Sequence, residues 1–575
     1  MLPGAHDVSP VGRPFLLSDA QLRRSVAVDA SERAMARVLS KLESGAPIRI
    51  GVLGSSVAMS GGCQAEYQPH LRCAQFDGLQ VKKRFARGYG VVDDEMKGLL
   101  HNSDRPVRGF ILQLLDAINA TWPHREHRVI NSAVDAWTAK AIEPCLLSNE
   151  ALLNSDLLLL ELGSQSWHSS QAAASERIVR KLLARASGPP PAMVMVTTRQ
   201  WCGRSVHGLR RGERPVLLRT WEGIEDIFAS FCGAYGLACL SLRDAIFHDV
   251  VASLPNFTVA DVAADCLHPE QSRFGYHYMA DMLIHWLKRS WRRYREGGGT
   301  PTKAIVDPPR PLPPALLPGN RGSAGRMVWR CYDLPATPAT GDLALPNAPD
   351  GAAEGPTAVA RARRAVRGKL EVAWQAETGG AAAVSDTASC DALRRCVLRA
   401  AKTGDGTCLR GRGHWQHCTR ALAPRAVNKP GIVSVLPGAA MRLVVDTTAP
   451  VVGNGSALPQ AALALTYLAS YERMGLGVVS CVSGCSCAPR TIDALHFAQP
   501  ATAAGGGGGG AEGIGRNVSI ATIAEIPVSS ARSCVVRLEN KARGGGAIGG
   551  SPNAGGLQVA KWKLLQVRVG WELGL

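Results

Sequence analysis

The chain has 575 residues and a formal net charge of +18, with 46% hydrophobic and 19% charged residues. This length exceeds one core of ordinary size, so two folded domains joined by linkers are expected. The sequence has no apolar run of about 18 residues, which argues against a membrane span. The excess of basic over acidic residues favours an acidic partner. The sequence has no zinc-finger spacing, RNP signature or basic zipper, so nucleic acid is not expected as that partner.

Sixteen cysteines indicate an oxidising compartment. Residues 1–15 lack the apolar core of a signal peptide, so either the true start lies upstream or the protein is intracellular. On balance the sequence predicts a secreted or endomembrane location, with no signal peptide visible in this chain. Four N-x-[ST] sequons agree, and they are glycosylation candidates: Asn119, Asn256, Asn454 and Asn517.

The first predicted element is a helix over residues 18–42. Ser18 is a suitable N-cap, and apolar residues recur after it at roughly helical spacing. Gly45 and Pro47 stop the helix. Residues 1–45 are therefore expected to form a helical lead-in to the first domain.

A second block, residues 46–295, alternates short apolar runs with helical stretches. Its last helix is predicted over Ser272–Trp291, with an apolar stripe. Short apolar runs bounded by helices are typical of buried parallel strands. The block is therefore predicted to be an α/β domain with strands at Ile48–Leu53, Arg128–Ile130, Leu157–Leu162, Met193–Thr197 and Leu237–Leu242.

The amino-acid composition changes twice along the rest of the chain. Residues 296–425 are rich in Pro, Gly and Ala and are predicted to be a linker and variable region. Residues 426–575 hold short β-prone runs between turn signals, which predicts a β-rich, sandwich-like domain. The runs are Gly431–Leu436, Met441–Asp446, Ala462–Tyr471, Gly477–Cys481, Val518–Ile523 and Cys534–Leu538.

Two short segments of the α/β block could carry chemistry. The first predicted strand ends in a small-residue turn with Ser56, at the edge where open α/β sheets bind ligands. Asp265 precedes His268 by three residues, so its carboxylate could accept the Nδ1–H and leave Nε2 as a base. Each segment also has a structural reading: the first as a simple turn, the second as a turn cap and helix entrance before Pro269.

Together these segments resemble the SGNH (GDSL-type) hydrolase superfamily, whose blocks are G-D-S, a second-strand glycine, G-x-N-D and D-x-x-H. The resemblance covers about residues 46–290 and implies a flavodoxin-like, three-layer parallel sheet. The residues that flank the first and last blocks resemble a subgroup with a GSS-type first block. Members of that subgroup have a β-rich C-terminal region, and Tyr467–Cys487 is similar to it. The blocks correspond to Gly54-Ser55-Ser56, Asn131-Ser132-Ala133, Gly163-Ser164-Gln165-Ser166 and Asp265 to His268.

The resemblance implies a triad in which Ser56 is the nucleophile, His268 the base and Asp265 the residue that orients it. The oxyanion would be held by the backbone N–H groups of Ser56 and Ala133 and by the amide of Gln165. Ser55, Ala133 and Gln165 are among the positions that depart from the family pattern. Ser55 replaces an aspartate, and Ala133 replaces a glycine but keeps its N–H. Gln165 replaces an asparagine and carries the same amide on a side chain that is one methylene longer.

The implied activity is a metal-independent serine esterase, without a cofactor, acting on carboxylic and in particular acetyl esters of carbohydrate. Its partner would be an ester-bearing small molecule or an acidic polysaccharide. Two alternatives stay open: a polysaccharide O-acetyltransferase, and a catalytically silent glycan-binding protein, which Gln165 favours.

The C-terminal cysteines Cys481, Cys485 and Cys487, with His496 downstream, admit two readings. One is a zinc site, but their spacing is unusual for one. The preferred reading is disulfides, with Cys534 as a further partner, although the sequence does not give the pairing.

Overall fold

The computed structural model describes most of two regions of regular structure, and all structural statements below concern these residues. They are residues 14–61, 109–134, 137–163, 169–184, 189–202, 217–221, 223–263, 266–269, 274–298, 312–320, 327–333, 367–369, 416–420, 428–434, 437–449, 461–470, 474–495, 520–542 and 561–572.

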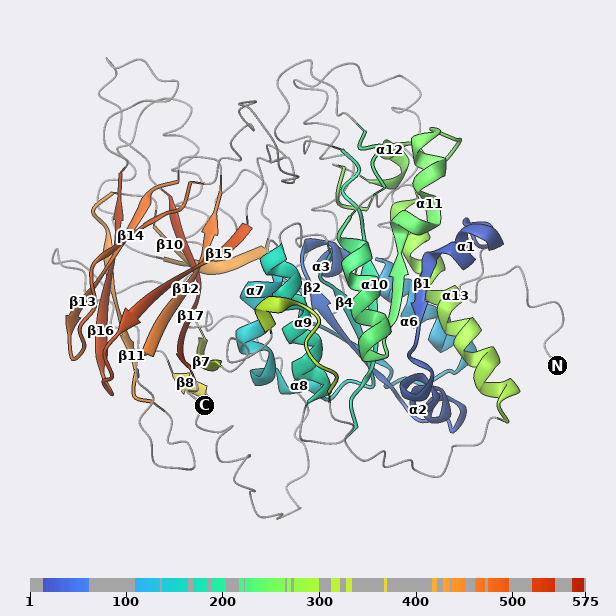
Figure 1. Cartoon of the computed structure of the whole chain (residues 1–575), viewed down its shortest axis with the longest axis horizontal. Coiled ribbons are helices and arrows are strands. Elements are labelled where there is room, and N and C mark those ends of the chain that lie inside the picture. Colours follow the sequence, from blue (N-terminus) through green and yellow to red (C-terminus); the bar gives the residue numbers. More distant parts are fainter. Residues whose placement is uncertain are drawn as a thin grey trace, which may run out of the picture. The chain divides into compact units, whose positions relative to one another are not determined.

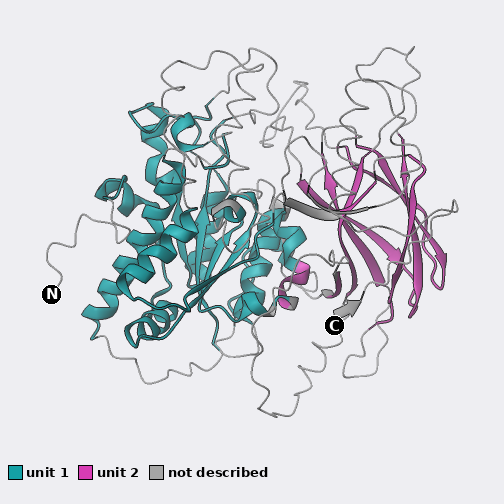
Figure 2. Cartoon of the chain, turned by 180° about the vertical axis from the view of Figure 1, so that it is seen from behind, with its two compact units in different colours: residues 1–143, 149–321, 498–517 teal, residues 144–148, 322–497, 518–575 magenta. Residues whose placement is uncertain are grey.

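The chain divides into two compact units, which Figure 2 colours separately. Unit 1 holds the described residues within 1–143 and 149–321, and unit 2 those within 144–148, 322–497 and 518–575. Unit 1 is a mixed α/β region with a largely parallel sheet, and unit 2 is a β-rich, largely antiparallel region.

The sheet of unit 1 has the strand order β1-β6-β5-β4-β2-β3. Neighbours from β6 to β3 pair in parallel, which places their carboxyl ends at one edge of the sheet. The predicted buried strands are confirmed within about two residues at each end. The strands are β1 (Val26–Asp29), β2 (Arg49–Gly54), β3 (Arg128–Asn131), β4 (Leu157–Glu161), β5 (Ala192–Thr197) and β6 (Ala238–Ser241).

Helices cover both faces of this sheet (Figure 1). One group, with α2, α6 and α13, packs together over one large core, and α9 and α10 contact each other on the other face. The closing helix predicted over 272–291 is observed as α13, although residues 272–273 lie outside the described part. The helices are α1 (Asp19–Ser25), α2 (Glu32–Glu43), α3 (Ser56–Gly61), α6 (Phe110–Thr121), α7 (Ala139–Ile142), α8 (Glu150–Leu153), α9 (Ser169–Leu183), α10 (Ile224–Tyr235), α11 (Leu242–Val251), α12 (Val259–Val262) and α13 (Gly275–Glu296), with the 3-10 turn η4 (Pro318–Asn320). The 3-10 turn η2 (Glu143–Ser148) belongs to unit 2 except for its first residue.

The prediction of one helix over residues 18–42 is wrong. Helix α1 ends at Ser25, and residues 26–29 form β1, which pairs antiparallel with β6 at the sheet edge. Two β-branched residues, Val26 and Val28, alternate along this short segment and fit a strand better than a helix. The helical spacing of apolar residues on either side concealed the break.

Part of the segment predicted as a linker packs on unit 1. The carboxylate of Glu176 in α9 accepts hydrogen bonds from the backbone N–H groups of Leu316 and Leu317, at 2.6 and 3.1 Å. It also accepts from Asn320 Nδ2 at 2.6 Å. The residues that make this contact lie among prolines. Composition alone therefore did not distinguish the segment 312–320 from a linker.

Unit 2 contains two sheets whose residues share one hydrophobic core, as expected for a sandwich. The larger sheet has the order β15-β12-β17-β10-β9, with β7 paired to β17 and β8; the smaller has the order β11-β16-β13-β14. All pairs are antiparallel except β7–β8. The strands are β7 (Met327–Asp333), β8 (Arg367–Lys369), β9 (Gln416–Arg420), β10 (Asn428–Ser434), β11 (Ala440–Val445), β12 (Ala461–Ala469), β13 (Leu476–Ser483), β14 (Arg490–Asp493), β15 (Ile520–Val528), β16 (Cys534–Lys541) and β17 (Trp562–Glu572).

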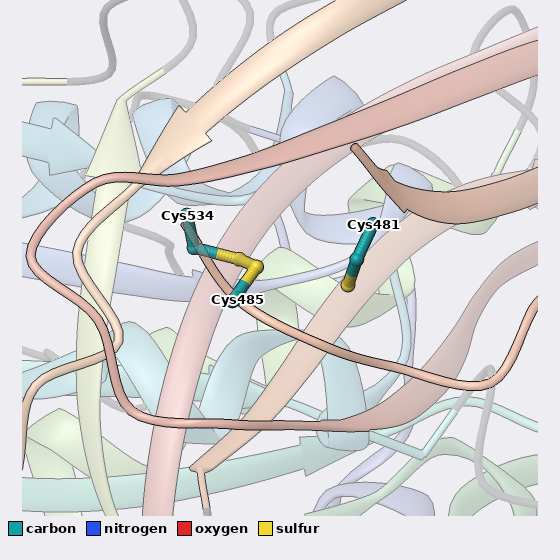
Figure 3. Close-up of side chains that lie close together, drawn as sticks. All are labelled: Cys481, Cys485 and Cys534. Carbon is teal, nitrogen blue, oxygen red and sulfur yellow. A yellow bond between two sulfur atoms is a disulfide. The ribbon is translucent and has the colours of Figure 1, made fainter. Parts of the chain in front are cut away.

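Disulfides form in both units. The preferred reading of the C-terminal cysteines is confirmed, with bonds Cys481–Cys487 and Cys485–Cys534. Figure 3 shows the second bond with Cys481 beside it, and the three sulfurs lie within 4.8 Å of one another. Further bonds are Cys145–Cys331, Cys202–Cys266 and Cys232–Cys239.

Within the described ranges, no helix is both long enough and apolar enough to cross a membrane.

Candidate active site

The candidate site begins where β2 ends, at the turn into α3. A Cβ on Gly54 would lie 2.6 Å from the backbone oxygen of Glu161 and 2.8 Å from the Cβ of Ala58. Only glycine therefore allows β2 and β4 to approach this closely while the chain turns into α3. The turn leaves Ser55 and Ser56 at the carboxyl edge of the parallel strands.

Ser55 is held by a buried carboxylate. Its backbone N–H and its Oγ donate to Oε2 of Glu161, at 3.3 and 3.0 Å, and Glu161 is 2% exposed at the end of β4. Glu161 therefore fixes the turn that presents Ser56. The sequence interpretation missed this residue, because the run Leu157–Leu162 marks a buried strand and gives no sign of where its one carboxylate points.

Ser56 and His268 lie in direct contact, although 212 positions separate them in the sequence. The Oγ of Ser56 is 2.7 Å from Nε2 of His268. Ser56 is 1% exposed and starts α3, while His268 is half-buried in the segment between α12 and α13. This is the distance at which a histidine can remove a proton from a serine hydroxyl.

The segment that carries His268 is fixed at several points. Ala263 and Pro269 form an antiparallel bridge on either side of it. The carbonyl of Cys266 accepts a hydrogen bond from the backbone N–H of Trp201 at 2.7 Å, and Cys266 is bonded to Cys202. Trp201 and Cys202 follow β5, so the histidine segment is joined to the sheet.

The second block lies at the end of β3, next to α3. Nδ2 of Asn131 donates to the backbone oxygens of Ala58 and Met59, at 3.2 and 3.4 Å. The backbone N–H of Ala133 donates to Oδ1 of the same Asn131 at 3.0 Å. The structure thus places Ala133 near the first turn of α3, with its N–H directed at a side-chain oxygen.

The remaining predicted site residues have different positions. Asp265 and Gln165 lie outside the described residues, as do the sequons at Asn454 and Asn517. Asn119 is half-buried in α6, and Asn256 is exposed, with φ +70°.

An ion network around the buried side chain of Arg243 lies at the same edge of the sheet, beyond β5 and β6. Arg243 is 3% exposed and donates to both oxygens of Asp226, at 2.7 and 2.9 Å. These hydrogen bonds lower the pKa of Asp226, whereas burial raises the pKa of the neighbouring Glu225. The guanidinium also lies 4.3 Å from the ring centre of Trp221, which joins the loop after β5 to α11.

No protein-family model and no curated protein matches the chain. Among solved structures, it is similar to a two-domain esterase active on acetylated mannans, with 10% identity, a TM-score of 0.46, and coverage of 96% of this chain and 99% of that chain. Axe2, an acetylxylan esterase from Geobacillus stearothermophilus, shows 13% identity and a TM-score of 0.28, covering 42% of this chain and 95% of its own. The acetyl xylan esterase AlAXEase shows 11% identity and a TM-score of 0.24, covering 41% and 98%.

Proposed function

We propose that this chain is a serine esterase of the SGNH type that hydrolyses acetyl esters on carbohydrate. The observation that carries the proposal is the contact of Ser56 Oγ with His268 Nε2 at 2.7 Å, at the carboxyl edge of the parallel strands. A serine and a histidine at this distance form the core of an acyl-transfer site.

In the proposed mechanism Ser56 Oγ attacks the acyl carbonyl while His268 Nε2 takes the hydroxyl proton. His268 then returns that proton to the departing sugar oxygen, which leaves Ser56 acetylated. Water attacks the acetyl-serine with His268 again as base, so acetate leaves and the serine is restored. Asp265 has the role of orienting the imidazole and stabilising its charged form, which follows from its place three residues before His268.

The proposed oxyanion donors are the backbone N–H groups of Ser56 and Ala133 and the amide of Gln165. Ala133 donates to Oδ1 of Asn131 in this structure. Its N–H is therefore proposed to exchange this neutral acceptor for the oxyanion, which is the stronger acceptor when charge develops.

The carbohydrate part of the proposal rests on the whole chain. A net charge of +18 favours an acidic polysaccharide, and the β-rich unit 2 is proposed to help retain it. The disulfides of both units are compatible with an oxidising environment, so we propose a secreted or endomembrane glycoprotein.

Acetate release from an acetylated acidic polysaccharide, compared with release from acetylated xylan and mannan oligosaccharides, tests this function. The wild-type chain is expected to release acetate, and Ser56→Ala and His268→Ala are expected to abolish most of it. Adding an unacetylated acceptor glycan distinguishes the transferase: acetyl groups would then appear on the acceptor instead of as free acetate. Glycan binding without any acetyl transfer, in a folded wild-type chain, would contradict the esterase and favour a silent binding protein.

A further inference from the structure

We infer that the Cys202–Cys266 disulfide is a positioning pair that keeps His268 in contact with Ser56. The inference rests on the proposed function, because His268 is the base of that mechanism. Cys266 lies two residues before His268, and the bond joins it to Cys202, in the segment that follows β5. Both cysteines are buried, at 1% and 2% exposure, so the bond lies inside the unit.

The partner segment is well suited to hold the histidine in place, because it continues from an interior strand. β5 lies between β4 and β6 in the sheet. Trp201, next to Cys202, is 1% exposed within the core of unit 1. Its N–H donates to the carbonyl of Cys266 at 2.7 Å, and its own carbonyl accepts from Leu218 N–H at 2.8 Å. The disulfide therefore ties the histidine segment to a fixed part of the scaffold.

The backbone at Cys266 has an uncommon conformation. Cys266 has φ +71°, in the left-handed region that non-glycine residues seldom occupy. Such a conformation persists when the surroundings enforce it. Removing the disulfide takes away one of the restraints on this segment, beside the Trp201–Cys266 hydrogen bond and the Ala263–Pro269 bridge. A return of Cys266 toward negative φ, two residues before His268, would then displace the imidazole.

The chain provides a matched control in Cys232–Cys239, a second disulfide of unit 1. Cys239 lies near the start of β6 and Cys232 near the end of α10. Because the strands are parallel, this bond is at the sheet edge opposite the one that holds Ser56. Its removal tests the general effect of losing a buried disulfide without altering the histidine segment.

The test is a double-mutant cycle read by the rate at which a fluorophosphonate probe labels Ser56. Cys202→Ala/Cys266→Ala and Cys232→Ala/Cys239→Ala are each made with His268 present and with His268→Ala. A second variant, Cys202→Ala/Cys266→Gly, goes through the same measurements. Because glycine adopts φ +71° readily, this variant is expected to lose less of the labelling rate than Cys202→Ala/Cys266→Ala. Near-ultraviolet circular dichroism and thermal midpoints establish that each variant is folded.

Removing Cys202–Cys266 is expected to slow labelling about 10-fold to 100-fold with His268 present, since a misplacement of about 1 Å costs up to about 100-fold. In the His268→Ala background the same removal is expected to change the residual rate less than about twofold, because the group that it positions is gone. The control pair is expected to leave the rate nearly unchanged in both backgrounds. Equal losses in the two backgrounds, or an equal loss in the control pair, would overturn the inference.

If the wild-type chain itself resists the probe, the proposed function fails and the positioning role is decided by crystal structures of the two variants. A Ser56–His268 contact kept at 2.7 Å without the Cys202–Cys266 bond would refute the role. Its loss in that variant alone would support it.

Discussion

At the scale of single residues, the site depends on how one hydroxyl is presented. The resemblance to SGNH hydrolases singles out Ser56 and His268 in the sequence, and the structure brings Ser56 Oγ and His268 Nε2 to 2.7 Å from each other. Their catalytic roles stay a prediction. Glu161 and the Cys202–Cys266 pairing could not be predicted. Both arise from contacts between segments about 64 to 106 positions apart, which no local pattern records.

The role of Glu161 gives the first prediction. Glu161→Ala removes the acceptor of two Ser55 hydrogen bonds and is expected to lower the Ser56 acylation rate at least tenfold, since misplacement of a reacting group costs up to about 100-fold. Glu161→Gln keeps an amide oxygen that can accept, so it is expected to retain most of the rate. Ser55→Ala keeps the backbone N–H bond and is expected to have a small effect. Stopped-flow acylation with p-nitrophenyl acetate measures all three; equal rates for Ala and Gln at position 161 would contradict this role.

Gln165 gives a second prediction at the same scale. If it supplies an oxyanion donor on a stem that is one methylene too long, Gln165→Asn is expected to raise the acylation rate and Gln165→Ala to lower it. The gain is limited to the contribution of one donor, about 2.7–4 kcal/mol. Ala133→Gly is the matched control and is expected to change little, because both residues offer the same N–H. Unchanged turnover with Asn and with Ala at position 165 would show that Gln165 does not face the oxyanion.

At the scale of elements, the apolar runs of the α/β block were sufficient to predict its parallel strands, since strands buried on both faces are continuously apolar. The same reasoning failed for residues 26–29. A four-residue edge strand is too short to show the alternation of apolar and polar residues that marks a strand. The helices on either side show a clearer spacing of apolar residues, and that spacing is helical. The pairing of β1 with β6 is a long-range contact that the local sequence does not contain.

The close approach of β2 and β4 predicts a glycine requirement. Gly54→Ala is expected to destabilise the chain by about 1–3 kcal/mol, the usual cost of overpacking, and to lower activity by displacing Ser55 from Glu161. The control is Gly233→Ala in α10, where a Cβ meets nothing within 4 Å. That substitution is expected to stabilise by about 0.5–1 kcal/mol, as in any exposed helix interior. Urea unfolding midpoints measure both; a Gly54→Ala variant as stable as the wild type would contradict the packing described at the turn.

At the scale of the whole molecule, stability is predicted to fall as the pH drops below neutrality. Burial lowers the pKa of His127 from its usual value near 6.5. The ring is neutral in the fold: Nδ1 accepts from Ile48 N–H at 3.0 Å, and Nε2 contacts the Trp122 carbonyl at 2.8 Å. The unfolded chain therefore binds the proton at higher pH than the folded chain does. His127 thus costs no stability well above pH 6.5 and an increasing amount as the pH falls toward its lowered value.

Urea unfolding between about pH 8 and pH 5 measures this dependence. His127→Gln is expected to make the decline shallower than in the wild type. Identical pH dependence in the wild type and His127→Gln would rule out this contribution.

Fluorophosphonate labelling followed by mapping of the modified residue tests most directly whether Ser56 is an activated nucleophile. We expect one adduct, on Ser56, that is absent in Ser56→Ala, strongly slowed in His268→Ala and retained in Ser55→Ala. An adduct on another serine, or a folded wild-type chain in which Ser56 stays unmodified, would contradict this role of Ser56.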